Sequence, residues 1–150
     1  MRIVIQRVSR SSVTIGGVLK SEIGQGMMIL LGVEDADTEE DVEWLCAKVS
    51  KLRIFEDENG AMNLDINQVD GSFLVVSQFT LHAMTKKGNR PSFIRAARPE
   101  KAIPLYELFL KRLHEISDRP VQSGEFGADM DVELINDGPV TILIDSQNRE

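Results

Sequence analysis

A nearly continuous apolar run over residues 27–33 constrains the fold more than any other feature of the sequence. Such a run is expected of a strand that is buried on both faces of a sheet. Shorter apolar runs at residues 12–15 and 18–23 flank Gly16-Gly17. Two glycines supply the positive φ angles that a two-residue hairpin turn requires, so these runs are predicted to form a hairpin.

The remaining predicted strands cover residues 2–8, 53–55, 72–78, 132–135 and 140–144. The last two would be joined by a hairpin turn, because Asp137-Gly138 between apolar runs is a strong signal for a tight turn. The bond between Gly138 and Pro139 would be trans, since only about 5–6% of such bonds are cis and nothing local favours that state.

Two helices are predicted. The first begins at Asp37 as its N-cap, with Glu40 three residues later, and carries an apolar stripe that includes Cys46. Because Cys46 lies in that stripe, it is interpreted as a core residue rather than a nucleophile. The second helix covers residues 99–116, and Pro104 within it would mark a kink or the true start.

Two helices combined with many short strands indicate an α+β fold, with a mostly antiparallel, partly closed sheet or barrel. A length of 150 residues suits one domain, spanning residues 1–150. Charged residues make up 27% of the chain, no apolar run reaches the roughly 18 residues of a membrane span, and the N-terminus lacks a signal peptide pattern. A cytoplasmic protein that begins at or near Met1 is therefore expected.

Cysteine and histidine, the usual ligands of structural zinc, are scarce in this chain. One cysteine excludes an intrachain disulfide. Two histidines, His82 and His114, cannot complete a structural zinc site with it, since such sites use four Cys or His ligands at short spacings. No metal and no cofactor are predicted. His114, among charged neighbours in the second helix, is expected to be solvated.

The charge of the chain is unevenly distributed. The net charge is −7, which argues against extended binding to a phosphate backbone. Residues 86–101 nevertheless hold six cations and one acid, and most of these cations lie in a long connection, residues 79–98, that lacks clear periodicity. Such connections are often functional. A basic rim on an acidic body suits a small phosphate-bearing end, and the alternative is a solvated loop that happens to be basic.

One candidate reactive segment lies where a predicted strand enters the basic connection, at residues 77–81. Backbone N–H groups that become free at a strand end can stabilise an oxyanion, and Thr80 could orient water or act as a nucleophile. A polar strand end without function is the alternative. His82 is the only histidine near this segment, and it is expected to be a loop residue without a role in proton transfer. The chain has no Gly-x-Ser-x-Gly elbow, P-loop or dinucleotide fingerprint.

Two segments resemble the paired signatures of the D-aminoacyl-tRNA deacylase family. Members carry Ser-Gln-Phe-Thr-Leu and Asn-x-Gly-Pro-Val-Thr, and this chain has both, at residues 77–81 and 136–141. Further blocks resemble the family in the same order, at residues 1–8, 52–57, 88–93 and 126–130. The resemblance covers nearly the whole chain, and the two signatures at this spacing make it specific.

The resemblance implies a homodimeric enzyme that hydrolyses the ester between a D-amino acid, or glycine mischarged on tRNA(Ala), and the 3′ end of tRNA. Its partners would be the acceptor end of aminoacyl-tRNA and a second copy of the chain. Gln78, Phe79 and Thr80 match the catalytic positions, where backbone N–H groups would donate to the oxyanion. No side-chain nucleophile is implied, because the 2′-OH of the terminal adenosine would help to activate water.

Other positions match the family's substrate pocket. Ser77, Phe126 and Met130 correspond to substrate-binding residues. Gly138-Pro139 matches a cis element whose carbonyls enter the pocket of the other subunit, bind the substrate's amino group and exclude an L side chain. Arg7 matches an arginine that braces this element across the dimer.

The chain departs from the commoner family pattern after Leu81. Many relatives carry Tyr-Gly-Asp at this point, where this chain has His82-Ala83-Met84, so the resemblance assigns no role to His82. Three other interpretations stay open. They are an esterase that uses Thr80 with His82 as base, a non-enzymatic RNA-binding dimer that uses the basic connection, and an inert scaffold dimer.

Overall fold

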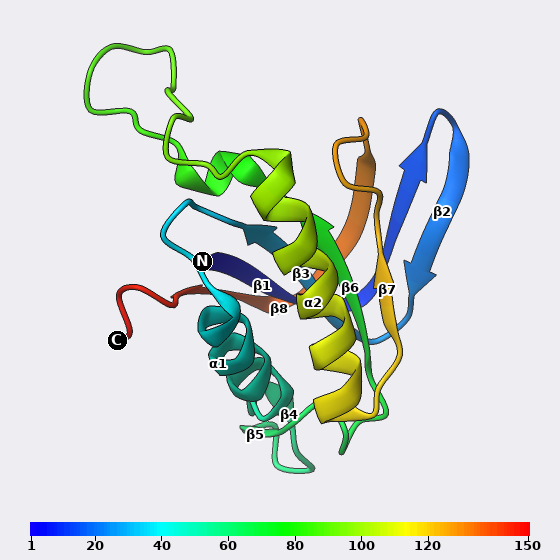
Figure 1. The fold of residues 1–150 in the computed structure, drawn as a ribbon. Helices are drawn as coiled ribbons and strands as arrows, with labels where there is room; N and C mark the ends of the chain where they lie inside the picture. The colour runs from blue at the N-terminus through cyan, green and yellow to red at the C-terminus, as the bar shows by residue number, and fades with distance from the viewer.

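A six-stranded mixed sheet organises the fold, in a computed structural model that describes residues 1–150 (Figure 1). Its strands run in the order β2-β1-β3-β6-β7, and β8 pairs with β1. They are β1 (Arg2–Ile15), β2 (Val18–Ile23), β3 (Gly26–Gly32), β6 (Ser72–Ser77), β7 (Val121–Ser123) and β8 (Asp131–Asp145). A separate two-stranded sheet pairs β4 (Phe55–Glu56) with β5 (Met62–Leu64).

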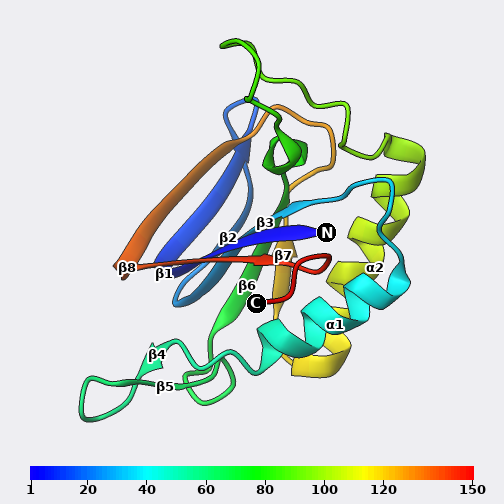
Figure 2. The ribbon, with the colours of Figure 1, turned by 90° about the vertical axis from the view of Figure 1, so that its left-hand side faces the viewer.

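Two helices cover one face of the sheet, and Figure 2 shows them side by side on it. They are α1 (Glu39–Ser50) and α2 (Pro99–Ser117), and a short 3-10 helix, η1 (Phe79–His82), follows β6. The main core, which includes Ile29, Phe73 and Phe109, fills the space between helices and sheet. Full burial of each such side chain contributes about 1.5–3 kcal/mol of transfer free energy.

A second, smaller core lies on the opposite face of the sheet. Met28 and Leu74 belong to it, while their neighbours Met27 and Phe73 point into the main core, as the alternation of side chains along a strand requires. The prediction that residues 27–33 form a strand buried on both faces is therefore confirmed.

The pairing of the strands is mostly antiparallel, as predicted, but two of the pairs are parallel. β1 pairs in antiparallel fashion with β2, β3 and β8, but β3–β6 and β6–β7 are parallel, so the sheet is mixed. The chain crosses over from β3 through α1 before it returns as β6, as a parallel connection requires. The sheet curls towards closure, since Ser21 Oγ in β2 donates to the Ser123 carbonyl in β7 at 2.6 Å.

The C-terminal hairpin predicted around Asp137-Gly138 is wrong. β8 is one continuous strand, because Asn136 faces Val8 and Thr141 faces Gln6, so both halves run antiparallel to β1. Residues 137–140 bulge outward opposite Arg7, and the backbone N–H of Val140 donates to Asn136 Oδ1 at 2.9 Å across the neck of this bulge. The bond between Gly138 and Pro139 is cis, contrary to the local prediction.

The helix boundaries also differ in detail. Thr38, not Asp37, caps α1, and Asp41 completes its capping box. Asp37 instead turns inward, where its buried carboxylate binds the amino group of Met1, a stronger electrostatic partner than a helix end. Pro104 lies inside α2 and does not mark its start, which is at Pro99. Neither helix is long and apolar enough to span a membrane.

Two side-chain predictions are confirmed. Cys46 is fully buried in the main core, and burial raises the pKa of its thiol to about 12, so the reactive thiolate is scarce at neutral pH. His114 is exposed on α2, and its Nδ1 lies 2.8 Å from the carbonyl oxygen of Arg119.

Candidate active site

A cavity of about 290 Å³ opens at the end of the sheet where β3 and β6 finish. It is lined by the ends of these strands, by residues at the start of α2 and by the segment between β7 and β8. Ten of its fourteen lining residues are hydrophobic. Five positions singled out from the sequence meet in it, namely Ser77, Gln78, Phe79, Phe126 and Met130. Residues from distant parts of the chain are thus brought into one apolar pocket.

Aromatic side chains fix two walls of this cavity. Phe126 packs against Tyr106, with ring centroids 5.9 Å apart, and Tyr106 is anchored because its hydroxyl donates to the Val75 carbonyl at 2.9 Å. Burial raises the pKa of Tyr106 to about 12, so the phenol remains a proton donor. Phe79 lies at the mouth, 55% exposed, and packs edge-on against Phe93 with centroids 5.1 Å apart.

The strand end beside the cavity leaves two backbone donors open. β6 ends at Ser77, and the N–H of Gln78 donates to the Leu31 carbonyl at 2.7 Å. The next two residues form the first turn of η1, where N–H groups have no partner within the helix. The N–H groups of Phe79 and Thr80 donate to no group of the protein. A pair of adjacent, unpaired N–H groups at an apolar pocket can stabilise a developing oxyanion.

Thr80 has no base beside its hydroxyl. Its Oγ1 accepts a hydrogen bond from Gln78 Nε2 at 2.6 Å. His82 lies at the end of η1, but it is fully buried and neither ring nitrogen has a hydrogen-bond partner, so it does not bond to Thr80. His82 thus lies in a short helix rather than in the loop that was expected. The geometry offers Thr80 as a backbone donor and does not form a Thr-His pair.

The Gly138-Pro139 bulge lies outside this cavity. Both residues are exposed, and neither lines the pocket of its own chain. Arg7, only 3% exposed, supports the bulge from beneath. Its Nε donates to the Asp137 carbonyl at 3.1 Å, and its Nη1 donates to the Ile54 carbonyl at 2.8 Å. Arg7 therefore holds the bulge in place on β8.

Comparison with known proteins identifies the family. The family model described as D-Tyr-tRNA(Tyr) deacylase matches residues 4–145. A protein of Akkermansia muciniphila is 65% identical over 150 residues, and one of Bacteroides fragilis is 63% identical. Both are named D-aminoacyl-tRNA deacylase, and each match covers 100% of both chains. This chain belongs to the D-Tyr-tRNA(Tyr) deacylase family. The expected class of enzyme, a hydrolase that acts on aminoacyl-tRNA, is confirmed by this membership.

Solved structures agree with the fold of this deacylase. The c-Myc DNA Unwinding Element Binding Protein superimposes with a TM-score of 0.90 at 41% identity, over 97% of this chain and 98% of the other. A probable eukaryotic D-amino acid tRNA deacylase superimposes with a TM-score of 0.80 at 18% identity, over 95% and 97% of the two chains. The second likeness concerns the fold alone.

The basic connection of the deacylase forms a projecting arm, residues 83–98, visible as the green loop at the upper left of Figure 1. Met84 and Ser92 exchange two backbone hydrogen bonds that close the arm into a loop. Lys86, Lys87 and Arg90 are exposed near its tip and have no acidic partner.

Sequence reasoning missed Glu34, which lies just beyond β3. Its side chain is buried and pairs with Arg95 of the arm at 2.8 Å. A single acid after a strand resembles an ordinary solvated loop residue, so no sequence signal singled it out. The structure contains no group of three or more His, Cys, Asp or Glu side chains that could hold a metal ion.

Proposed function

We propose that this deacylase hydrolyses the ester of D-aminoacyl-tRNA, and of glycyl-tRNA mischarged on tRNA(Ala), and releases the free amino acid and tRNA. It would thereby proofread chirality during translation in the cytoplasm. The observation that carries the proposal is the pair of unpaired N–H groups of Phe79 and Thr80 beside an apolar cavity. Family membership supplies the class of substrate.

In this mechanism the aminoacyl group enters the cavity against Phe126 and Met130. The ester carbonyl lies next to Phe79 and Thr80, whose N–H groups donate to the oxyanion as water attacks. Each such donor contributes roughly 10²–10³ in rate in hydrolases that use them. The 2′-OH of the terminal adenosine assists the water, which accounts for the absence of a base beside Thr80.

Discrimination between D and L esters would come from Gly138-Pro139 of a second copy of the chain. The bulge is exposed and lies outside its own cavity, while Arg7 holds it rigidly from beneath. Inserted into a partner's cavity, its carbonyls would bind the amino group of the substrate. They would leave no space for an L side chain, whereas glycine, which has no side chain, would pass.

A homodimer is required by this arrangement, and the surface of β8 supports it. Leu143 and Ile135 are 65% and 47% exposed on this strand, on either side of the bulge. Apolar side chains gathered on one surface are typical of contact regions. Sedimentation that finds an active monomer would exclude the cross-subunit selector.

The exposed arm is the proposed seat of the tRNA acceptor end. Its cations stand on a chain with a net charge of −7, so they suit a few phosphates near the reacting ester rather than a long duplex. One structural relative is named for binding DNA. The alternative, a nucleic-acid-binding dimer without turnover, is excluded if charged tRNA is hydrolysed.

The test is the release of amino acid from D-Tyr-tRNA, L-Tyr-tRNA and Gly-tRNA by the wild type and by Gly138→Ala. A Cβ at Gly138 would lie 2.9 Å from Val140 Cγ2 and 3.0 Å from Arg7 Nη2, at a φ of +126°. Gly60→Ala is the matched control, because Gly60, in the β4–β5 turn, also has positive φ but has open space around it.

Three outcomes separate the alternatives. Rapid loss of the D and glycyl esters with the L ester intact, impaired in Gly138→Ala and not in Gly60→Ala, supports both the reaction and the selector. Cleavage of D and L esters alike would retain the hydrolase and refute the selector. Absence of all cleavage would leave the nucleic-acid-binding alternative.

A further inference from the structure

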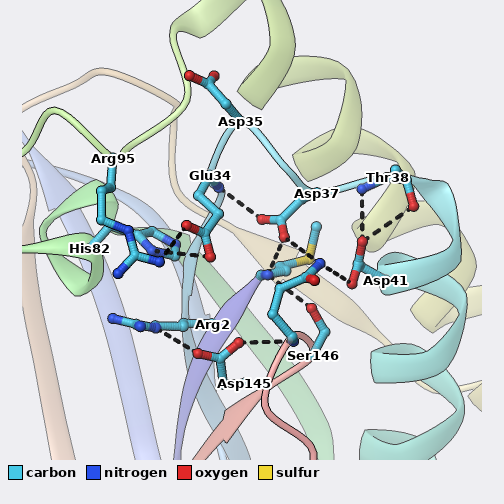
Figure 3. A network of polar contacts seen from close by, with 12 residues as sticks. Arg2, Glu34, Asp35, Asp37, Thr38, Asp41, His82, Arg95, Asp145 and Ser146 are labelled. Carbon is cyan, nitrogen blue, oxygen red and sulfur yellow. Dashed lines mark hydrogen bonds and ion pairs between the residues drawn. The ribbon is translucent and has the colours of Figure 1, made fainter.

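His82 is fully buried, yet neither of its ring nitrogens has a hydrogen-bond partner. Most buried polar side-chain atoms in proteins are paired, so an unpaired imidazole at the end of η1 requires a physical reason. Figure 3 shows the ring beside the carboxylate of Glu34, with Nδ1 at 3.9 Å from Oε1.

Glu34 divides its carboxylate between two partners. Oε1 faces His82, and Oε2 accepts a hydrogen bond from Arg95 Nη2 at 2.8 Å. The backbone of Glu34 is itself fixed, because its N–H donates to Asp37 Oδ2 at 2.8 Å and the residue forms an isolated bridge with Ala96. The buried carboxylate is therefore held in place while it holds the root of the arm.

The other charged groups near this site have partners elsewhere. Arg2 reaches the Leu81 carbonyl at 3.1 Å through Nη1, but its Nε pairs with Asp145 at 2.8 Å. Asp37 binds the amino group of Met1. Neither His82 nor Arg95 has an ion pair with any acid other than Glu34.

Glu34 thereby connects three segments near the cavity mouth: the end of β3, the end of the arm and η1. Its neighbour Val33 lines the cavity, and the Val33 carbonyl accepts a hydrogen bond at 2.9 Å from the N–H of Ala97, which lines the cavity beside it. His82 closes η1, the short helix that presents Phe79 and Thr80. A shift of the Glu34 carboxylate would loosen the arm and η1 together.

The cations of the arm consequently fall into two groups. Lys86, Lys87 and Arg90 near the tip, and Arg98 at the base, are exposed and without acidic partners, so they are free to bind phosphates. Arg95 is also exposed, but its guanidinium is engaged by Glu34. Arg95 is thus suited to anchor the arm rather than to bind the ligand.

We propose that Glu34 is a positioning residue, which anchors the basic arm through Arg95 and braces η1 through His82. The anchored arm holds its tip cations in a fixed direction, and these cations bind phosphates at the 3′ end of tRNA. The inference rests on the proposed function for the identity of that ligand. The anchor itself is a property of the free protein.

The direction in which Glu34→Gln changes the affinity for tRNA tests whether Glu34 anchors the arm. Removal of a carboxylate close to a basic surface ordinarily strengthens binding of a polyanion, because a repulsive charge is lost. If Glu34 positions the arm, Glu34→Gln has the opposite effect and weakens binding of uncharged tRNA about fivefold. Glu34→Asp, which keeps the charge, retains part of the affinity. Fluorescence anisotropy measures this without any hydrolysis, and thermal melting verifies that each variant is folded.

A double-variant comparison identifies the role of Arg95. Arg95→Ala is expected to weaken tRNA binding, and the double variant is no worse than Glu34→Gln alone, because the contact between Glu34 and Arg95 is already lost in that single variant. Lys87→Ala is the matched control for loss of one cation from the arm. It lowers the salt dependence of binding by about one unit, whereas Arg95→Ala leaves that dependence nearly unchanged.

NMR of the histidine rings tests whether the contact between Glu34 and His82 stabilises η1. The chain has two histidines, so the ¹⁵N signals of His82 and exposed His114 are easily assigned. Glu34→Gln is expected to shift the His82 signals and leave those of His114 in place, and Lys87→Ala shifts neither. In catalysis, Glu34→Gln lowers kcat on a D-aminoacyl ester of adenosine, which has no phosphate, while Lys20→Ala, at an exposed position in β2 outside the cavity and the arm, does not.

Several results would overturn the anchor. One is tighter tRNA binding by Glu34→Gln than by the wild type. The others are additive effects of Glu34→Gln and Arg95→Ala on tRNA binding, and His82 NMR signals that do not change in Glu34→Gln. A wild type that hydrolyses no ester would instead refute the proposed function, while the NMR comparison would still decide on the anchor.

Discussion

Arg7 donates from Nε to the carbonyl oxygen of Asp137 at 3.1 Å, directly beneath the bulge that carries the cis Gly-Pro bond. The same guanidinium reaches the Ile54 carbonyl and the exposed carboxylate of Glu56, at 2.8 and 3.4 Å. One buried side chain therefore ties β8 to the segment around β4. The planar fork of arginine suits this task, because it presents several donors in fixed directions.

Replacement of this arginine by lysine is expected to destabilise the protein. A lysine ammonium cannot reach the Asp137 and Ile54 carbonyls in the same directions, so Arg7→Lys leaves the buried Ile54 carbonyl or the Asp137 carbonyl unpaired. The free energy of unfolding should fall by about 2–4 kcal/mol, measured by urea denaturation. Arg10→Lys is the matched control, since Arg10 is exposed in the same strand and should change stability by less than about 0.5 kcal/mol. Equal effects of the two variants would contradict the brace.

Much of the fold follows from local sequence, and the exceptions share a cause. The apolar run at residues 27–33 and the Gly16-Gly17 turn were predictable, because burial on both faces and positive φ are properties of the segments themselves. The continuity of β8 was not, since an Asp-Gly pair between apolar runs predicts a hairpin locally. Only the long partner strand β1, which pairs with both halves, determines that the chain continues.

The candidate site was predictable to a similar degree. Free N–H groups were expected at the end of the strand that precedes Phe79, and the structure has them. That Phe126 and Phe79 line the same cavity could be predicted only from the family resemblance, because nothing in the local sequence indicates which segments will share a cavity. Glu34 and the burial of His82 were missed, since both depend on how the arm folds back onto β3.

The side chain of Thr80 is expected to be dispensable for most of the activity. If its backbone N–H is the working group, Thr80→Ala loses only the hydrogen bond from Gln78 Nε2. Its kcat on D-Tyr-tRNA should fall less than about tenfold. Loss of a nucleophile would cost roughly 10⁴-fold or more. Steady-state deacylation kinetics distinguish the two, and Thr80→Ser, which retains a hydroxyl, serves as the comparison. A loss of nearly all activity in Thr80→Ala, with activity retained in Thr80→Ser, would support the alternative esterase mechanism in which Thr80 is the nucleophile.

Acid is expected to destabilise the protein through Asp41 and Asp145. Burial by itself would raise the pKa of each carboxyl, but hydrogen bonds, from Ser146 and Thr38 to Asp41 and from Arg2 and Gln147 to Asp145, outweigh it and lower both pKa values. A carboxyl with a lowered pKa in the folded state binds fewer protons than in the unfolded state. Its stabilising contribution is therefore present above the ordinary value of about 4 and lost as pH falls through the folded pKa.

Urea midpoints between pH 6 and pH 2.5 measure this loss. Asp41→Asn and Asp145→Asn should each flatten the decline below about pH 4, because the variant has no carboxyl to protonate. Asp131→Asn is the control, since Asp131 is exposed at the start of β8 and has no ion pair. An unchanged decline in both variants would show that other carboxyls determine acid stability.

Gly124 is expected to control the size of side chain that the cavity accepts. A Cβ at this position would lie 2.4 Å from Met130 Sδ, and Met130 lines the cavity. Because a methionine side chain is flexible, Gly124→Ala should push it into the pocket at a cost of about 1 kcal/mol or less in stability. KM for D-Tyr-tRNA should then rise about tenfold, while KM for Gly-tRNA changes little, because glycine needs no space there. Met130→Ala added to Gly124→Ala removes the displaced atoms and should restore KM for the tyrosyl ester. If both esters lose activity equally, the substitution acts on the fold and Met130 does not limit the pocket.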